Sequence, residues 1–195
     1  MKIGLFFGSF NPVHNGHLII ADYIAQETLV EQIWFVPSPH NPLKDKKTLL
    51  AFHQRVELLQ LCLADTPYLK ICTIEDKLPR PSYTIDTLQA LQKQYPQHTF
   101  SLIIGEDNLS TLPKWKSFET LIANYSWIVF PRINTPISLL HDYHTVQLLK
   151  EAPIIQLSST YIRQKIQENR EVSFMMHPSA YQYMKEMNFY KKNKK

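Results

Sequence analysis

Short apolar runs alternate along this chain with longer segments in which apolar residues recur every three or four positions. The short runs are apolar on successive residues, which is typical of strands that are covered on both faces. They predict strands at residues 2–7, 32–37, 69–74, 100–104, 127–130 and 154–157. A longer segment at residues 52–63 predicts a helix with Phe52, Val56, Leu59 and Leu63 on its core face. This alternation predicts an α/β fold, a Rossmann-like doubly wound parallel sheet flanked by helices on both faces.

Ligands of open α/β sheets bind outside the carboxyl ends of the strands. Gly8, Ser38, Gly105 and Ser158 each follow a predicted strand directly, so we expect four loops to converge at one edge of the sheet. The chain has only four glycines and contains neither a GxGxxG fingerprint nor a GxxxxGK[ST] phosphate loop. Any phosphate must therefore be held by other turns at this edge.

The length and composition suit one compact unit. A chain of 195 residues with 44% hydrophobic residues is long enough for one proper core. We predict a single domain at residues 1–189, followed by a Lys-rich tail at residues 190–195. The first seven residues are too short an apolar run for a secretory signal, and no run approaches the ~20 apolar residues of a membrane span. We therefore expect a cytoplasmic protein without a membrane partner.

The net charge of +4 is concentrated at the end of the chain. Four lysines account for all of it, namely Lys191, Lys192, Lys194 and Lys195. A nucleic-acid surface requires basic residues on a folded face, so we expect no nucleic acid as a partner. Cys62 and Cys72 lie inside apolar runs without CxxC spacing, which favours buried thiols over a disulfide or a zinc site.

The densest cluster of polar and helix-breaking residues is GSFNPVHNGH, residues 8–17, between the first strand and the first helix. A glycine turn that opens a helix directs backbone N–H groups and a positive dipole end at one spot, which suits a phosphate. His14 and His17 are three residues apart, so their imidazoles would lie on one helix face and flank the anion. Either could instead be a structural histidine, and the pair could be two ligands of a metal.

This segment resembles the GxFxPxHxGH signature of the nucleotidyltransferase superfamily. The resemblance implies transfer of a nucleoside monophosphate from a triphosphate, with His14 and His17 as catalytic residues. It also implies that Gly8, Ser9 and Phe10 contact ATP. The superfamily alone does not define the acceptor.

Two further segments resemble one branch of this superfamily, the bacterial nicotinate-nucleotide adenylyltransferases. RPSYTIDTL, residues 80–88, resembles the SYTxDTL segment of the branch, which implies that Tyr83 and Thr84 help to hold the pyridine carboxylate. IIGEDNLSTLPKW, residues 103–115, resembles IIGxDxLxxLPxW, which implies that Gly105 and Asp107 lie near ATP and that Trp115 stacks on the nicotinate ring. Taken alone, the polar residues would serve as helix caps and Trp115 as a core residue.

A fourth segment, LSSTYIRQKI, residues 157–166, resembles the ISSTxIR motif of the superfamily. The resemblance implies that Ser159, Thr160 and Arg163 hold the triphosphate, and a guanidinium suits this role because it pairs bidentately with phosphate oxygens. A capped helix with a solvent-facing arginine would explain the same residues.

The chain departs from the branch at two places. Where the branch has PPHK or PPHR, this chain has NPLK, which leaves Asn41 and Lys44 as candidates for the mononucleotide phosphate. Where the branch has paired arginines after the fifth strand, this chain has Pro131 and Arg132, so Arg132 is the remaining acceptor candidate.

The resemblance as a whole implies an enzyme that joins ATP and nicotinate mononucleotide to nicotinate adenine dinucleotide and pyrophosphate in NAD biosynthesis. We expect Mg²⁺ to arrive with ATP and no metal site made by the protein. The alternatives are another acceptor, such as phosphopantetheine or nicotinamide mononucleotide, a polyanion-binding protein that uses the lysine tail, and a zinc hydrolase based on the two histidines. The sequence does not define the oligomeric state, and a homo-oligomer is compatible with it.

Overall fold

The computed structural model describes residues 1–39, 48–133 and 144–191 and contains one six-stranded parallel sheet. The strand order is β3-β2-β1-β4-β5-β6. The strands are β1 (Lys2–Gly8), β2 (Gln32–Pro37), β3 (Leu69–Ile71), β4 (Thr99–Gly105), β5 (Ser126–Phe130) and β6 (Val146–Leu148). This arrangement confirms the predicted Rossmann-like α/β fold.

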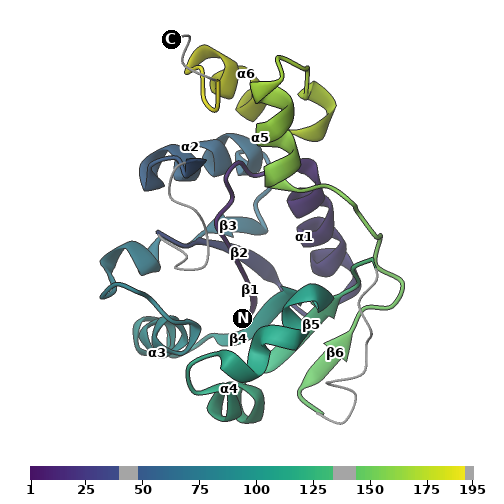
Figure 1. The fold of residues 1–195 in the computed structure, drawn as a ribbon. Coiled ribbons are helices and arrows are strands. Elements are labelled where there is room, and N and C mark those ends of the chain that lie inside the picture. The colour runs from purple at the N-terminus through teal and green to yellow at the C-terminus, as the bar shows by residue number, and fades with distance from the viewer. Residues whose placement is uncertain (40–47, 134–143, 192–195) are drawn as a thin grey trace.

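Helices lie between the successive strands from β1 to β5 and, with the helices that follow β6, cover both faces of the sheet (Figure 1). The α-helices are α1 (Asn15–Glu27), α2 (Phe52–Leu63), α3 (Thr84–Gln94), α4 (Phe118–Asn124), α5 (Ser159–Gln167) and α6 (Pro178–Glu186). Short 3-10 helices are η2 (Ile74–Lys77), η3 (Glu106–Lys114) and η4 (Ser173–Met175). The predicted helix at residues 52–63 has the bounds of α2. No helix within the described ranges combines the length and the apolar character that crossing a membrane requires.

Alternate residues of the strands face two separate cores, because successive side chains of a strand point to opposite faces. In β1, Phe6 joins the core under α1, α2, α5 and α6, whereas Leu5 joins the core under α3 and α4. Figure 1 shows these two groups of helices on opposite sides of the sheet. Both faces of the central strands are thus buried, which explains why their sequences are apolar without alternation.

Two predicted strands differ from the observed ones. The predicted strand at residues 154–157 has no strand structure, and β6 lies earlier, paired with β5 from Trp127↔Val146 to Val129↔Leu148. Ile154 is 57% exposed, whereas Ile155 and Leu157 pack against the core as part of an irregular segment. The predicted strand at residues 69–74 stops at Ile71, because η2 begins at Ile74. β6, a three-residue edge strand of mixed burial, carried too little apolar pattern to be predicted.

The order of the sheet reverses between β1 and β4, which lie side by side in register from Lys2↔Thr99 to Phe6↔Ile103. Ligand crevices of doubly wound sheets lie at this point, outside the carboxyl ends of the two strands. The turn after β1 and the start of η3 after β4 therefore frame the candidate site.

Candidate active site

The turn after β1 is built around a ring that folds back over a glycine. Phe10 has a left-handed backbone with φ of 44°, and its ring lies against Gly8, where an added Cβ would come 2.8 Å from Phe10 Cζ. The ring is 2% exposed and packs edge-on against His17, with 5.1 Å between ring centroids. A side chain at position 8 would expel this ring. Phe10, a predicted ATP contact, therefore has its side chain in the core, where it shapes the turn.

The two histidines of the turn have unequal surroundings. The backbone N–H of His14 donates to His17 Nδ1 over 3.2 Å, so in the neutral ring of His17 the proton is on Nε2. His17 is partly exposed at the start of α1, where unpaired N–H groups and the dipole favour an anion. His17 Nε2–H is therefore a fixed donor at the predicted position.

His14 lies beneath His17 instead of beside it. The rings stack with 3.7 Å between their centroids, and the His14 side chain is 3% exposed with Nδ1 buried and unpaired. Burial, helped by the positive charge of Arg132, lowers the pKa of His14 to about 3. The expectation that two equivalent imidazoles flank the anion is therefore wrong for this structure. His14 is the N-cap residue of α1 and has an extended backbone, so its side chain does not lie on the same helix face as that of His17.

Helix α5 docks directly on this turn. Ser159 Oγ donates to the carbonyl of Pro12 over 2.8 Å, and Arg163 Nη1 donates to the carbonyl of Asn11 over 2.8 Å. Arg163 Nη2 also donates to Thr160 Oγ1 over 3.2 Å. The structure thus brings the predicted triphosphate residues beside the predicted catalytic turn. Ser159 and Arg163 thus hold the backbone of the turn. This role was not predicted, because the resemblance implied only that they bind phosphate.

Arg132 lies with the predicted ATP residues instead of the acceptor residues. Its Nε is 3.7 Å from Asp107 Oδ1, and its Nη1 donates to the carbonyl of Ile155 over 3.2 Å. Its backbone N–H donates to the buried carboxylate of Glu106 over 3.0 Å. A Cβ on Gly105 would come 2.4 Å from Asp107 Oδ1, so a side chain at position 105 would displace the Asp107 carboxylate. Arg132, which was predicted to bind the acceptor, therefore lies beside Gly105 and Asp107, which were predicted to lie near ATP.

The predicted pyridine residues lie at the surface near α3. Tyr83 precedes the first turn of α3, which begins at Thr84, and Tyr83 is 42% exposed. Lys116 Nζ lies 4.8 Å from the centre of the Tyr83 ring and is held by the carboxylate of Asp86 at 2.9 Å. Trp115, which precedes Lys116, is half-buried, and its ring centroid lies 6.3 Å from that of Trp127. The candidates Asn41 and Lys44 lie outside the described residues.

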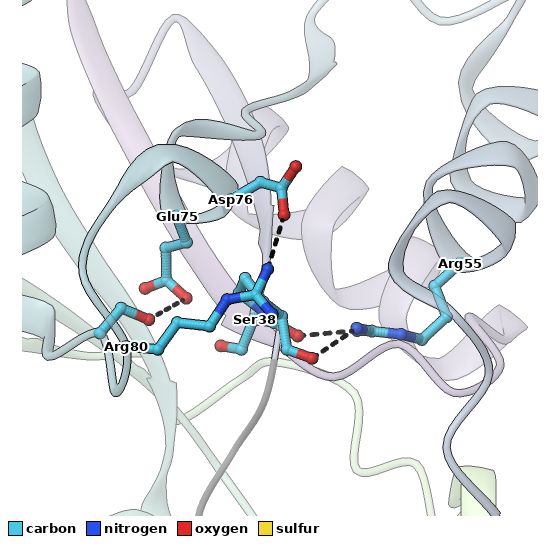
Figure 2. A network of polar contacts seen from close by, with 7 residues as sticks. Ser38, Arg55, Glu75, Asp76 and Arg80 are labelled. Carbon is cyan, nitrogen blue, oxygen red and sulfur yellow. Dashed lines mark hydrogen bonds and ion pairs between the residues drawn. The ribbon is translucent and has the colours of Figure 1, made fainter.

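Sequence analysis missed a buried arginine at the carboxyl edge of the sheet. Arg55 of α2 is 0% exposed, and its side-chain hydrogen bonds to described residues go to four backbone carbonyls. Figure 2 shows Arg55 on one side of Ser38, whereas Glu75 and Arg80 lie on its other side. The available signal was a charged residue within the apolar face of a helix, between Phe52 and Leu59.

A buried carboxylate was missed as well. Glu75 is 3% exposed and accepts hydrogen bonds from Ser82 Oγ at 3.1 Å and Thr87 Oγ1 at 3.0 Å. Burial raises the pKa of Glu75, and the hydroxyl groups of Thr87, Ser82 and Ser38 oppose this rise. Because Ser82 and Thr87 lie on either side of Tyr83, these hydrogen bonds to Glu75 hold the segment that leads into α3. Its position before RPSYTIDTL gave no sequence signal, because an acidic residue in a short helix is usually exposed.

The described part of the chain contains no group of three or more His, Cys, Asp or Glu side chains placed to hold a metal ion. Cys62 and Cys72 are both buried free thiols, as predicted.

Comparison with known proteins places these features in a family. A family model described as Cytidylyltransferase-like matches residues 5–165. A protein of Flavobacterium psychrophilum named probable nicotinate-nucleotide adenylyltransferase is 46% identical over 194 residues, which cover 98% of this chain and 100% of that protein. A protein of Porphyromonas gingivalis with the same name is 41% identical and covers 90% of this chain.

Solved structures show the same fold. The nicotinic acid mononucleotide adenylyltransferase of Plasmodium falciparum, complexed with NaAD, superposes with a TM-score of 0.81 at 20% identity over 97% of both chains. A putative nicotinate-nucleotide adenylyltransferase of Vibrio parahaemolyticus superposes with a TM-score of 0.73 at 19% identity, covering 97% of this chain and 94% of that one.

Proposed function

This chain belongs to the cytidylyltransferase-like family, and we propose that it joins ATP and nicotinate mononucleotide to nicotinate adenine dinucleotide, with release of pyrophosphate. The reaction is a step of NAD biosynthesis. The observation that carries the proposal is the turn after β1, where His17 Nε2–H is a fixed donor at the positive end of α1 and at the reversal point of the sheet. Relatives that match the chain over its full length bear the corresponding name.

The proposed reaction does not require a general base. The 5′-phosphate of nicotinate mononucleotide attacks the α-phosphorus of ATP, a new P–O bond forms, and the bond to the β-phosphate oxygen breaks as pyrophosphate leaves. A phosphomonoester has its second pKa near ~6, so at neutral pH the nucleophile is mostly a dianion and needs no deprotonation. Catalysis then consists of alignment and charge stabilisation.

His17 has the geometry for charge stabilisation. Its Nε2–H would donate to an α-phosphate oxygen, where negative charge redistributes in the transition state. His14, neutral and stacked beneath, would hold the His17 ring in place. We assign Gly8, Ser9 and the backbone of Phe10 to the same phosphate region.

The remaining candidates divide between the two substrates. We assign Gly105, Asp107, Thr160 and the partly exposed Arg163 to ATP; Arg163 would exchange or share its bond to Asn11 when the triphosphate binds. Mg²⁺ would enter as MgATP, as part of the substrate.

On the acceptor side, Tyr83, Thr84 and Trp115 would hold the pyridine ring and its carboxylate. Asn41 and Lys44 would hold the mononucleotide phosphate. Arg132, which lies beside Asp107, would contribute from the ATP side.

One assay tests the proposal and its alternatives. Pyrophosphate release is measured with MgATP and, in separate reactions, nicotinate mononucleotide, nicotinamide mononucleotide and phosphopantetheine. We expect the acid to be preferred, since N–H donors that face a carboxylate meet an amide NH₂ unfavourably. Turnover with phosphopantetheine alone, or with no acceptor, would refute the proposed function.

A further inference from the structure

Lys116 joins the two segments that the proposed function assigns to the pyridine ring of the acceptor. Its Nζ donates to both carboxylate oxygens of Asp86, in the first turn of α3, over 2.9 Å. The same Nζ lies 4.8 Å from the centre of the Tyr83 ring, and Lys116 follows Trp115 directly in the chain. One ammonium therefore lies where the segment that contains Trp115 meets the segment that contains Tyr83 and Thr84.

The ion pair between Lys116 and Asp86 is easily exchanged. The two side chains are 47% and 37% exposed, so water screens their attraction, and exposed pairs of this kind contribute little to stability. The lysine stem is flexible and its ammonium has three donors, so Nζ can turn from Asp86 toward a second anion without a change in the backbone. The positive charge at this position is thus available to a ligand.

The two forms of the acceptor differ at the group that this ammonium would meet. A pyridine ring held by Tyr83 and Trp115 would lie within reach of Lys116 Nζ. Nicotinate carries a carboxylate, whereas nicotinamide carries a neutral group that offers only its carbonyl oxygen to an ammonium. The bound ring would also exclude water from Nζ, and a charge-assisted hydrogen bond is stronger where water is excluded. Lys116 would therefore favour the acid by its charge.

We propose that Lys116 is a specificity-determining residue that binds the carboxylate of the acceptor's pyridine ring, and that Asp86 holds it in place before the acceptor binds. The proposal rests on the proposed function, because that function places the ring at Tyr83 and Trp115. When the acceptor binds, the ammonium exchanges or shares its bond to Asp86 with the ligand carboxylate. Loss of the ammonium therefore weakens binding of the acid. Loss of the Asp86 charge strengthens it, because Asp86 no longer competes for Nζ.

Removal of the ammonium tests the first effect. In Lys116→Met we expect the Kd of nicotinate mononucleotide, measured by calorimetry, to rise about 10-fold, as for the loss of a hydrogen bond to a charged group. The Kd values of nicotinamide mononucleotide and of ATP should change less than about 2-fold. Lys116→Arg should keep most of the preference for the acid, since it keeps the charge. A residue that only supported the fold would shift all three Kd values together.

Removal of the competing carboxylate tests the second effect. In Asp86→Asn we expect the Kd of nicotinate mononucleotide to fall about 2- to 5-fold, which is the range of an exposed ion pair. In the variant that carries both Lys116→Met and Asp86→Asn this gain should disappear, because Asp86 acts on the ligand through Lys116. A gain that persists without the lysine would show direct repulsion between Asp86 and the ligand, and it would refute the role of Asp86.

Lys93→Met is the matched control, because Lys93 is exposed in the last turn of α3, at the opposite end of the helix from Tyr83. It should leave all three Kd values unchanged. Circular dichroism verifies that each variant is folded, and Lys116→Gln provides a second neutral variant.

The outcomes separate the two proposals. If the wild type joins ATP to neither mononucleotide, the proposed function fails and the role of Lys116 fails with it. If the wild type is active and Lys116→Met keeps its preference for the acid, or loses affinity for acid and amide equally, only the role of Lys116 is refuted. A wild type that binds the amide as tightly as the acid refutes that role as well.

Discussion

On the ATP side of the site, side chains from distant segments bond to the backbone of one turn, whereas on the acceptor side Tyr83 is exposed and Trp115 is only half-buried. The ATP side comprises residues 8–17, 105–107 and 158–163, and the acceptor side comprises residues 82–84 and 115–116. On the ATP side, Arg163 and Ser159 bond to carbonyls of the turn and His14 is buried. On the acceptor side, Tyr83 is 42% exposed and contacts an exposed lysine.

This difference indicates where binding energy and rate arise. Donors that are fixed before the substrate arrives need no reorganisation during the reaction, so they act mainly on kcat. Exposed aromatic side chains gain their contacts only when a ring covers them, so they act mainly on affinity. Substitutions on the two sides should therefore change different kinetic constants.

The largest effect should come from the fixed donor of the ATP side. We expect His17→Ala to lower kcat by roughly 10²–10³, as for the loss of one oxyanion donor, while the Kd of ATP changes little. Steady-state kinetics and calorimetry measure the two quantities. His53→Ala is the control, because His53 is exposed on α2 and is assigned to neither substrate, and it should behave as wild type. A kcat near wild type in His17→Ala would make this histidine structural.

The acceptor side should show the opposite kinetic pattern. We expect Trp115→Ala to raise KM for nicotinate mononucleotide roughly 5- to 150-fold, because stacking on an aromatic side chain contributes about 1–3 kcal/mol. KM for ATP should remain within a factor of about two, and Trp115→Phe should recover part of the loss. An equal rise in both KM values would mean that Trp115 supports the fold through Trp127 instead of binding the ring.

The buried histidine of the ATP side should make stability depend on pH. The pKa of His14 is about 3 in the folded protein and about 6.5 when the chain is unfolded, so between these values the unfolded state binds the extra proton. This contribution is fully present above pH 6.5 and is lost as the pH falls toward 3. From pH 7 to pH 5 the loss is about 2 kcal/mol.

Urea unfolding at both pH values measures this contribution. Wild type should lose about 2 kcal/mol more than His14→Asn over the same interval, since all other groups titrate in both proteins. Equal losses would show that His14 is accessible to protons and that the ATP side is less closed than its geometry indicates.

The smallest effect concerns the end of the chain. Tyr190 Oη donates to Asn11 Oδ1 over 2.7 Å, although we predicted that position 190 begins the tail. Asn11 Oδ1 also accepts from the N–H of Leu50 over 3.1 Å, so Tyr190→Phe should cost only about 0.5–1.5 kcal/mol of unfolding free energy. Deletion of residues 191–195 should change neither stability nor kcat. If that deletion lowers kcat as well, the lysines take part in the reaction.

Much of the fold and part of the site were predictable from local pattern. The bounds of α2 and β2 match the prediction because long periodic or uniformly apolar segments carry a strong signal. The predicted strand at residues 154–157 was wrong, because an apolar run that leads to α5 is indistinguishable from a strand without knowledge of its neighbours. The motif segments at residues 8–17 and 158–163 were predicted as neighbours and lie together, whereas the contact of Arg132 with Asp107 was not predicted and its acceptor role stays a prediction.

The sequence by itself determined the class of the fold, the turn at the end of β1 and the residue types that can hold a polyphosphate. These depend on patterns of neighbouring residues. Only the tertiary structure decided that His14 is buried and neutral, that Arg163 bonds to Asn11, and that Arg55 joins two loops. The physical reason is that burial, pKa and hydrogen-bond partners depend on contacts between residues far apart in the chain, and one sequence carries no local record of them.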